Sequence, residues 1–377
     1  IEPGSPQVGE WTVLSVVEDP YIEVPRLSPL SYQFRAKSIN VFRATSEYTS
    51  IVELEMTPPS GFWNGSLTGS GALREAGTVG TGPSPVGIGW SPRTNEVWVA
   101  CSGFNYIHNA YTGAVIDILD NGAGSPSTYY YGFAYCPSNG YFYCPVRLGQ
   151  MYVVIDPVTR TIVTTIPAAS GVATGASGCY CPSNNCMYMS AIDRTYVIDC
   201  DTNAIVATIS NCGTTVGRPC FCPINGYIYI PDRTPFPDVI EVIDPDTNTT
   251  VTSITNAFAK DIVYCPIDEK LYSIEDTSGG SLFVIDPGTN TITSTITFTG
   301  TLTPSPNALV YCPVSGLIYV FDSANDTIIS VSPISGAVLG TVSVNVSSGG
   351  VPIWIPTAQS IWITGAASAG QISQASF

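Results

Sequence analysis

The sequence predicts an all-β protein of seven repeated four-stranded sheets, and three observations support this prediction. A proline-centred unit recurs at intervals of 41 to 47 residues. An aromatic residue follows each of these prolines by six positions. Runs of alternating Val, Ile and Thr occupy the rest of each unit, as expected for β-strands. The prolines are Pro92, Pro137, Pro182, Pro223, Pro266, Pro313 and Pro356, and the aromatic residues are Trp98, Tyr143, Tyr188, Tyr229, Tyr272, Tyr319 and Trp362.

Each unit divides into four short strands, as its second copy illustrates. The first strand ends at Cys136, and the others are expected over 141–144, 152–155 and 162–166. Four strands per unit, repeated seven times, are typical of a β-propeller. The sequence therefore predicts a seven-bladed β-propeller over residues 72–377.

Two kinds of turn are expected inside each unit. The turn over 137–140 starts with a proline, which presets φ, and ends with a glycine, which accepts a positive φ. The equivalent turn over 182–185 ends with Asn185 instead. Between the third and fourth strands an Asp-x-x-Thr sequence recurs, as at Asp156 and Thr159, where short polar side chains cap backbone N–H groups.

The last unit lacks a fourth strand, because the sequence ends just after its expected third strand. Residues 72–76 stand before the first unit at the spacing that fourth strands have elsewhere. We therefore expect residues 72–76 to complete the last blade, which would tie the two ends of the ring together and remove an open edge.

The repeats also carry a family resemblance. The segment over 283–296, Phe-Val-Ile-Asp-Pro-Gly-Thr-Asn-Thr-Ile-Thr-Ser-Thr-Ile, resembles YVTN-type β-propeller repeats, which are related to NHL and WD40 propellers. The resemblance covers about residues 70–377. It implies a seven-bladed propeller of the kind found in surface-layer and other extracellular proteins, whereas the Tyr-Cys-Pro at the end of the first strand departs from the commoner pattern.

Residues 1–58 do not fit the repeat. The segment 32–40 resembles the part of a fibronectin type III domain whose strand carries the tyrosine of a tyrosine corner. The resemblance implies flanking strands over 21–24 and 51–56 and covers only about half of such a domain. Either a longer protein supplies the missing strands, or another polypeptide completes the sheet by strand addition. The Pro- and Gly-rich residues 59–71 are the expected linker.

Composition excludes several classes of function. The net charge is −16 with 13 Lys and Arg, too few for a basic face, so we expect no nucleic-acid partner. No run of 18 apolar residues occurs, so we expect no membrane insertion. The one histidine, His108, stands in a strand, where a structural role is expected. We therefore predict no catalytic residues and no cofactor.

The cysteines predict packing in most places and one possible disulfide. Copies of one repeat position point the same way on separate blades, so they are expected to be small buried residues that do not pair. Cys181 and Cys186 flank a four-residue turn and form the possible disulfide. The Cys-x-Cys pairs at 179–181 and 220–222 stand in neighbouring blades, so no metal site is expected. The repeated cysteines are Cys136, Cys181, Cys222, Cys265 and Cys312.

Three acidic residues share the position just after the second strand: Asp232, Glu275 and Asp322. Because the loops that follow second strands emerge on one face of a propeller, these residues predict a possible acidic face for a cation or a cationic partner. The alternative is that they are ordinary solvated loop residues.

These observations favour a non-enzymatic structural or adhesive protein that is extracellular, at a cell surface or in a virion. We expect it to act through propeller surfaces, with protein partners in a homo-oligomer or repeated assembly. Two alternatives remain: a lyase-like or hydrolase-like propeller enzyme with a site at the central channel, and a module that recognises a peptide or glycan. Fold alone does not decide between them.

Overall fold

The structure is a computed structural model, and it falls into two compact units, Ile1–Ser70 and Gly71–Phe377. It describes residues 32–34, 52–54, 74–82, 84–120, 132–146, 150–168, 178–191, 194–210, 217–232, 238–255, 260–274, 280–298, 306–322, 325–344, 352–364 and 371–376.

The described part of the first unit is one pair of strands. β1 (Tyr32–Phe34) pairs antiparallel with β2 (Val52–Leu54), with Gln33 opposite Glu53. The expected strand over 21–24 and the rest of the fibronectin-like segment over 1–58 lie outside the described residues, as do residues 59–71 of the expected linker.

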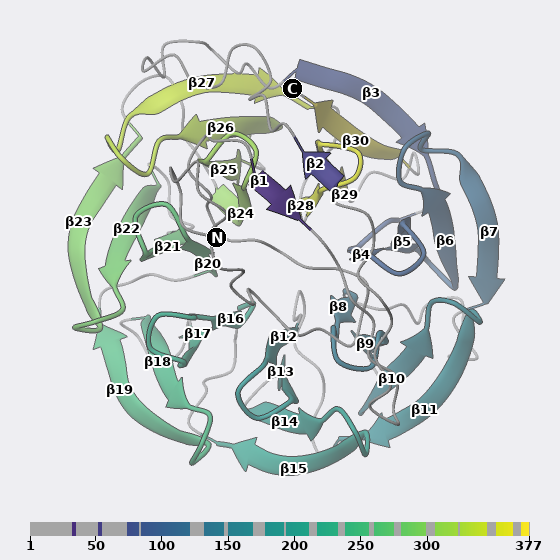
Figure 1. Cartoon of the computed structure of the whole chain (residues 1–377), viewed down its shortest axis with the longest axis horizontal. Helices are drawn as coiled ribbons and strands as arrows, with labels where there is room; N and C mark the ends of the chain where they lie inside the picture. The colour runs from purple at the N-terminus through teal and green to yellow at the C-terminus, as the bar shows by residue number, and fades with distance from the viewer. Residues whose placement is uncertain are drawn as a thin grey trace. The chain divides into compact units, whose positions relative to one another are not determined.

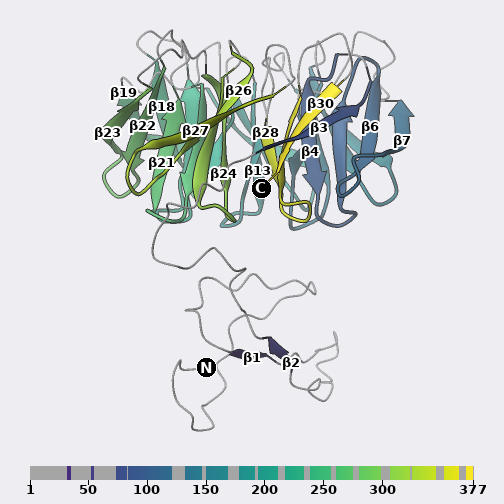
Figure 2. The ribbon, with the colours of Figure 1, turned by 90° about the horizontal axis from the view of Figure 1, so that it is seen from above.

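The described part of the second unit forms seven antiparallel four-stranded sheets, which confirms the predicted all-β propeller fold. Figure 1 shows the sheets around a common centre, with the first strand of each sheet innermost and the fourth outermost. Figure 2 shows the same sheets from the side, with the inner strands running between the two faces of the ring. We number the sheets 1 to 7 in chain order.

The strands alternate with short turns within each sheet. Sheet 1 holds β4 (Gly87–Ser91), β5 (Glu96–Ala100), β6 (Phe104–Asn109) and β7 (Val115–Asp120). Sheet 2 holds β8 (Ala134–Tyr135), β9 (Phe142–Pro145), β10 (Met151–Asp156) and β11 (Thr161–Pro167). Sheet 3 holds β12 (Gly178–Cys181), β13 (Cys186–Ser190), β14 (Thr195–Asp199) and β15 (Ala204–Ile209). Sheet 4 holds β16 (Cys220–Phe221), β17 (Ile228–Asp232), β18 (Val239–Asp244) and β19 (Thr249–Thr255). Sheet 5 holds β20 (Asp261–Cys265), β21 (Lys270–Ile274), β22 (Ser281–Asp286) and β23 (Thr291–Thr297). Sheet 6 holds β24 (Pro306–Cys312), β25 (Leu317–Asp322), β26 (Thr327–Val331) and β27 (Val338–Ser343).

Sheet 7 joins the two ends of the second unit. It holds β28 (Pro352–Ile355), β29 (Ser360–Thr364), β30 (Gln371–Ser376) and β3 (Arg74–Gly80), in that order. β3 pairs antiparallel with β30, with Thr78 opposite Ser373. The fourth strand of this sheet therefore comes from the beginning of the unit, although it runs over Arg74–Gly80 rather than the expected 72–76.

The turns between first and second strands adopt the predicted conformation. Gly140 has a φ of 76° and Asn185 a φ of 54° at the last turn position. The sequence pattern of Gly or Asn is not universal, because Glu269 (φ 59°) and Gln359 (φ 47°) hold the same position in two sheets. The hydrogen bonds of the hairpin thus impose the left-handed conformation even where the side chain disfavours it.

The Asp-x-x-Thr turns are capped as expected. The Oδ1 atom of Asp199 accepts hydrogen bonds from the backbone N of Asp201 at 3.1 Å and of Thr202 at 2.8 Å. The Thr202 hydroxyl donates to the same oxygen at 2.7 Å. These hydrogen bonds lower the pKa of Asp199 because they stabilise its charged form.

The repeated aromatic residues fill the space between sheets, and all seven are essentially fully buried. Hydroxyl groups of tyrosines in this set also join neighbouring sheets: Tyr188 on β13 donates to Oδ1 of Asn248 in sheet 4 at 2.6 Å, across 60 residues of chain. Asn184 donates to the Tyr188 hydroxyl at 3.0 Å and to the Pro245 carbonyl at 2.9 Å through Nδ2. We call this arrangement the Tyr–Asn clasp. It recurs with Asn139, Tyr143, Asn203 and the Cys200 carbonyl, and with Asn225, Tyr229, Asn290 and the Pro287 carbonyl.

Candidate functional site

The outermost strands form the described surface with the most exposed apolar side chains. Ile118 on β7, Val206 on β15 and Leu339 on β27 are 49 %, 57 % and 52 % exposed. Each outermost strand is last in its sheet, so in the described part of the chain its far edge has no strand beside it (Figure 1). Other exposed apolar residues on these strands are Val115, Ile116, Ile162, Val163, Val251 and Val338.

Charged groups are scarce on these outermost strands. β19 reads Thr-Thr-Val-Thr-Ser-Ile-Thr and β23 reads Thr-Ile-Thr-Ser-Thr-Ile-Thr, without a charged residue. On β7, Asp117 is paired with Arg160 of sheet 2 at 2.6 Å. Proteins commonly protect an exposed strand edge with lysine, proline or a bulge. The uncharged, β-branched edges of this ring are therefore suited to pairing with another strand.

The predicted acidic face is not formed by its described members. Asp232 and Asp322 are both 0 % exposed, and Asn325 donates to Oδ2 of Asp322 at 2.7 Å. Each residue closes the second strand of its sheet, so it is packed inside the sheet rather than placed in a solvated loop. Glu275 lies outside the described residues.

The repeated cysteines are buried, as predicted. Burial raises the pKa of Cys265 to about 12, so this thiol stays protonated and unreactive. Cys181 and Cys186 oppose each other in the β12–β13 register, but both are free thiols. Their sulfur atoms contact different oxygens, Ser183 Oγ at 3.1 Å and the Asn184 carbonyl at 3.3 Å. All five repeated cysteines, Cys136, Cys181, Cys222, Cys265 and Cys312, are 0 % exposed.

One thiol contact was not anticipated from the sequence. The thiol of Cys136 in sheet 2 interacts with the thiol of Cys200 in sheet 3, and this hydrogen bond lowers the pKa of Cys136. The two residues occupy different positions of the repeat, so only the stagger of neighbouring sheets brings them together. Within the described residues no three His, Cys, Asp or Glu side chains are grouped so that they could hold a metal ion.

His108 lies on β6, the third strand of sheet 1, and not on the innermost strands (Figure 1). Its Nδ1 lies 3.0 Å from the Gly113 carbonyl oxygen, so Nδ1 carries the proton and donates. Its Nε2 then accepts from the Thr81 hydroxyl at 3.2 Å, and its ring stands edge-on to Trp362 of sheet 7 at 6.1 Å. Burial lowers the pKa of His108. The residue therefore joins sheet 1 to the segment that follows β3.

A buried ion pair joins three sheets near the centre of the ring. Arg218, just before β16, donates from Nε to Oδ1 of Asp261 on β20 at 2.9 Å. Arg218 Nη2 also donates to the Leu309 carbonyl at 2.8 Å, and the Leu309 backbone N donates to Oδ2 of Asp261 at 2.7 Å. The two charged residues hold the same position in successive repeats, which is a signal available in the sequence. Their bidentate pairing neutralises the two charges within the protein.

Comparisons with known proteins support the fold. No protein-family model matches the chain, and no curated protein matches it. Among solved structures, Kuenenia stuttgartiensis hydrazine synthase is similar with a TM-score of 0.63 and 11 % identity, over 77 % of this chain and 95 % of that chain. At this identity the similarity concerns the propeller fold. No helix among the described residues has the length and apolarity needed to cross a membrane.

Proposed function

We propose that this protein is a non-enzymatic structural or adhesive protein that forms a repeated assembly through the outermost strands of its propeller. Its partners are further copies of the same chain. We also propose that the seven sheets are the blades of a YVTN-type propeller and that the N-terminal segment belongs to a fibronectin-like module. The protein would then act outside the cell, at a cell surface or in a virion.

The observation that carries this proposal is the exposure of uncharged β-branched side chains on unpaired outermost strands. Val163 on β11 is 42 % exposed, Val206 on β15 is 57 % exposed and Val251 on β19 is 48 % exposed. Antiparallel pairing of one such strand with its copy about a two-fold axis places residue i opposite residue j and residue j opposite residue i. Because β19 and β23 carry no charge, their pairing avoids like-charge contact although the whole chain has a net charge of −16.

Two groups of catalytic type among the described residues, His108 and the Arg218–Asp261 pair, support the same proposal. His108 is buried, hydrogen-bonded through both ring nitrogens and placed away from the innermost strands. The Arg218–Asp261 pair at the centre is satisfied within the protein. A general acid or base needs access to a substrate proton, and neither group offers it.

The test is assembly of a variant whose outermost strands carry lysine. Val163→Lys, Val206→Lys and Val251→Lys combined should abolish assembly, because lysine on an edge strand opposes strand pairing. The matched control replaces the same three valines with threonine, which keeps the strands uncharged and β-branched. Added lysines reduce the net negative charge, so a loss of assembly could not arise from greater overall repulsion.

Light scattering over a range of concentrations and negative-stain imaging measure the outcome. The wild-type chain and the threonine variant should form concentration-dependent assemblies, and the lysine variant should remain monomeric. A wild-type chain that stays monomeric at every concentration, or a lysine variant that still assembles, would contradict the proposal.

A further inference from the structure

The interface between sheets 2 and 3 differs from the equivalent interfaces in one residue. In each Tyr–Asn clasp the asparagine donates to a backbone carbonyl of the next sheet, so these carbonyls mark one position of the repeat. Between sheets 3 and 4 this position holds Pro245, and between sheets 4 and 5 it holds Pro287. Between sheets 2 and 3 it holds Cys200. One of the three clasps therefore carries a thiol where the other two carry a proline ring.

This replacement of proline by cysteine places two thiols together. Each clasp also contains the repeated cysteine three positions before its asparagine, and in the clasp between sheets 2 and 3 this residue is Cys136. The thiols of Cys136 and Cys200 share a hydrogen bond, and both residues belong to one apolar cluster that spans the two sheets. In the other two clasps Cys181 and Cys222 have only a proline at the equivalent place.

Hydrogen bonds anchor the backbone on both sides of this contact. The Cys136 carbonyl accepts from the backbone N of Gly140 at 2.8 Å. The backbone N of Cys200 donates to the Asn185 carbonyl at 3.0 Å, and the Cys200 carbonyl accepts from Nδ2 of Asn139 at 2.8 Å. With both backbones fixed, rotation of the two side chains alone changes the separation of the sulfur atoms. Such a fixed pair suits the narrow geometry that a disulfide requires.

The two thiols are shielded from solvent. Cys136 is 0 % exposed and Cys200 is 1 % exposed, and both are free thiols in the structure. An oxidant does not have to enter the folded ring, because the bond can form while sheets 2 and 3 are still packing together. Once formed, the bond lies in the interior, where attack by other thiols is slow because thiol–disulfide exchange depends on access.

We propose that Cys136 and Cys200 form a disulfide that joins sheets 2 and 3 when the protein folds in an oxidising environment. The oxidising environment rests on the location outside the cell proposed above, since disulfides persist there. The bond itself does not depend on assembly through the outermost strands.

The chemistry is thiol–disulfide exchange, with glutathione disulfide as the oxidant. The Cys136 thiolate attacks one sulfur of glutathione disulfide and releases the first glutathione. The Cys200 thiolate then attacks the Cys136 sulfur of this mixed disulfide and releases the second glutathione. Two electrons pass to glutathione disulfide, and the two thiol protons end on the two glutathione molecules.

The experiment refolds the reduced full chain in a glutathione redox buffer, blocks the remaining thiols and maps disulfides by tandem mass spectrometry of a non-reduced tryptic digest. Trypsin cuts after Arg160, so a bond between Cys136 and Cys200 joins two separate peptides. The wild-type chain should yield this pair, and Cys200→Ser should lose it. The control Cys222→Ser, at the repeat position of Cys136 but in the clasp with Pro287, should retain it. Circular dichroism should show the same β-sheet content in all three proteins.

Thermal unfolding of oxidised and reduced samples is the second readout. Reduction should lower the unfolding temperature of the wild-type chain by about 5 °C more than that of Cys200→Ser, because the bond closes a long loop of chain. Free Cys136 and Cys200 in the refolded wild-type chain, or Cys200 linked to another cysteine, would overturn the inference. An equal fall in the wild type and in Cys200→Ser would also overturn it. A monomeric chain that carries the cross-link would support this inference and contradict only the assembly.

Discussion

The Tyr–Asn clasp gives the most direct test of how the sheets are held together. Replacing Tyr188 with phenylalanine keeps the buried ring and removes only its hydroxyl, which donates to Asn248 at 2.6 Å and accepts from Asn184 at 3.0 Å. Asn184 keeps its bond to the Pro245 carbonyl, but Asn248 Oδ1 loses the donor from Tyr188. Loss of one partner of a buried hydrogen bond costs roughly 1–3 kcal/mol. We therefore expect the free energy of unfolding to fall by about that amount.

Denaturant unfolding followed by tryptophan fluorescence measures this change, and thermal unfolding should show a fall of about 1–4 °C for a chain of this size. Tyr111 provides the matched control, since its side chain is 66 % exposed and Tyr111→Phe should leave stability unchanged. If Tyr188→Phe matched that control within about 0.3 kcal/mol, the clasp would not contribute to stability, and packing of the rings alone would account for it.

Three further predictions concern the contacts that join distant parts of the ring. Asp261→Asn should cost about 3 kcal/mol in a denaturant titration, the low end of the range for a buried pair because the Arg218 side chain left uncompensated is 23 % exposed; a loss below about 1 kcal/mol would argue against this. Removing residues 1–80 takes away β3 and should cost about 3 kcal/mol or more for the lost β30 ladder, whereas removing residues 1–70 should change little. Burial lowers the pKa of His108, so the unfolded chain binds more protons and stability should fall as the pH drops below 6.5; thermal unfolding at two pH values should show a smaller fall for His108→Ile. An equal fall in both proteins would contradict the last prediction.

The sequence was sufficient for features set by local periodicity. The spacing of the prolines and aromatic residues located the strands, and the Asp-x-x-Thr pattern located the capped turns. These features depend on residues within a few positions of one another. Alternation of side chains along a strand then placed the repeated aromatic residues and cysteines in the interior.

Contacts between sheets could not be derived in this way. The Tyr188–Asn248 bond spans 60 residues and depends on how far one sheet is staggered against the next. The same stagger brings Cys136 to Cys200 and was not visible in either repeat alone. Burial of Asp232 and Asp322 was missed because a residue at the end of a strand and one at the start of a loop look alike in sequence.

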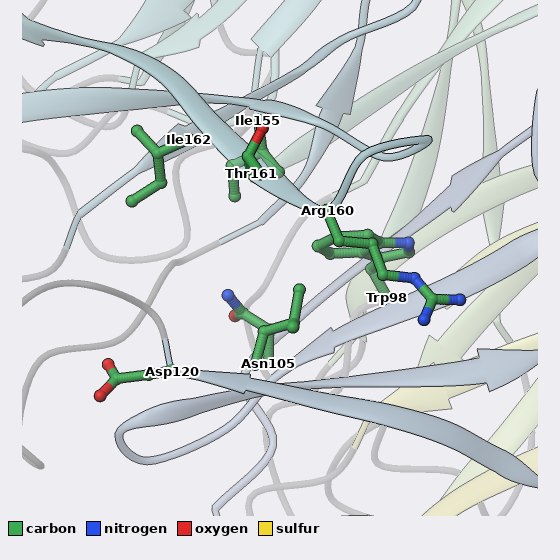
Figure 3. Close-up of a pocket in the computed structure, with 8 residues that line it drawn as sticks. Trp98, Asn105, Asp120, Ile155, Arg160, Thr161 and Ile162 are labelled. Atoms are coloured by element: carbon green, nitrogen blue, oxygen red, sulfur yellow. The ribbon is translucent and has the colours of Figure 1, made fainter.

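Sheet 1 carries two polar residues at third-strand positions, His108 and Asn105, and their chemistry indicates two separate reasons. Sheets 2 and 3 carry isoleucine at the register position of His108, Ile155 and Ile198, where apolar packing is sufficient. Sheet 1 faces sheet 7, which draws its outermost strand from the beginning of the second unit, and His108 accepts a hydrogen bond from Thr81 just beyond that strand. Asn105 makes no comparable bond through Oδ1 and stands at the opposite interface, toward sheet 2. Closure of the ring therefore explains why histidine stands at position 108, but it does not explain why asparagine stands at position 105. The cavity of about 110 Å³ that Asn105 and Arg160 line between sheets 1 and 2 requires a separate explanation (Figure 3).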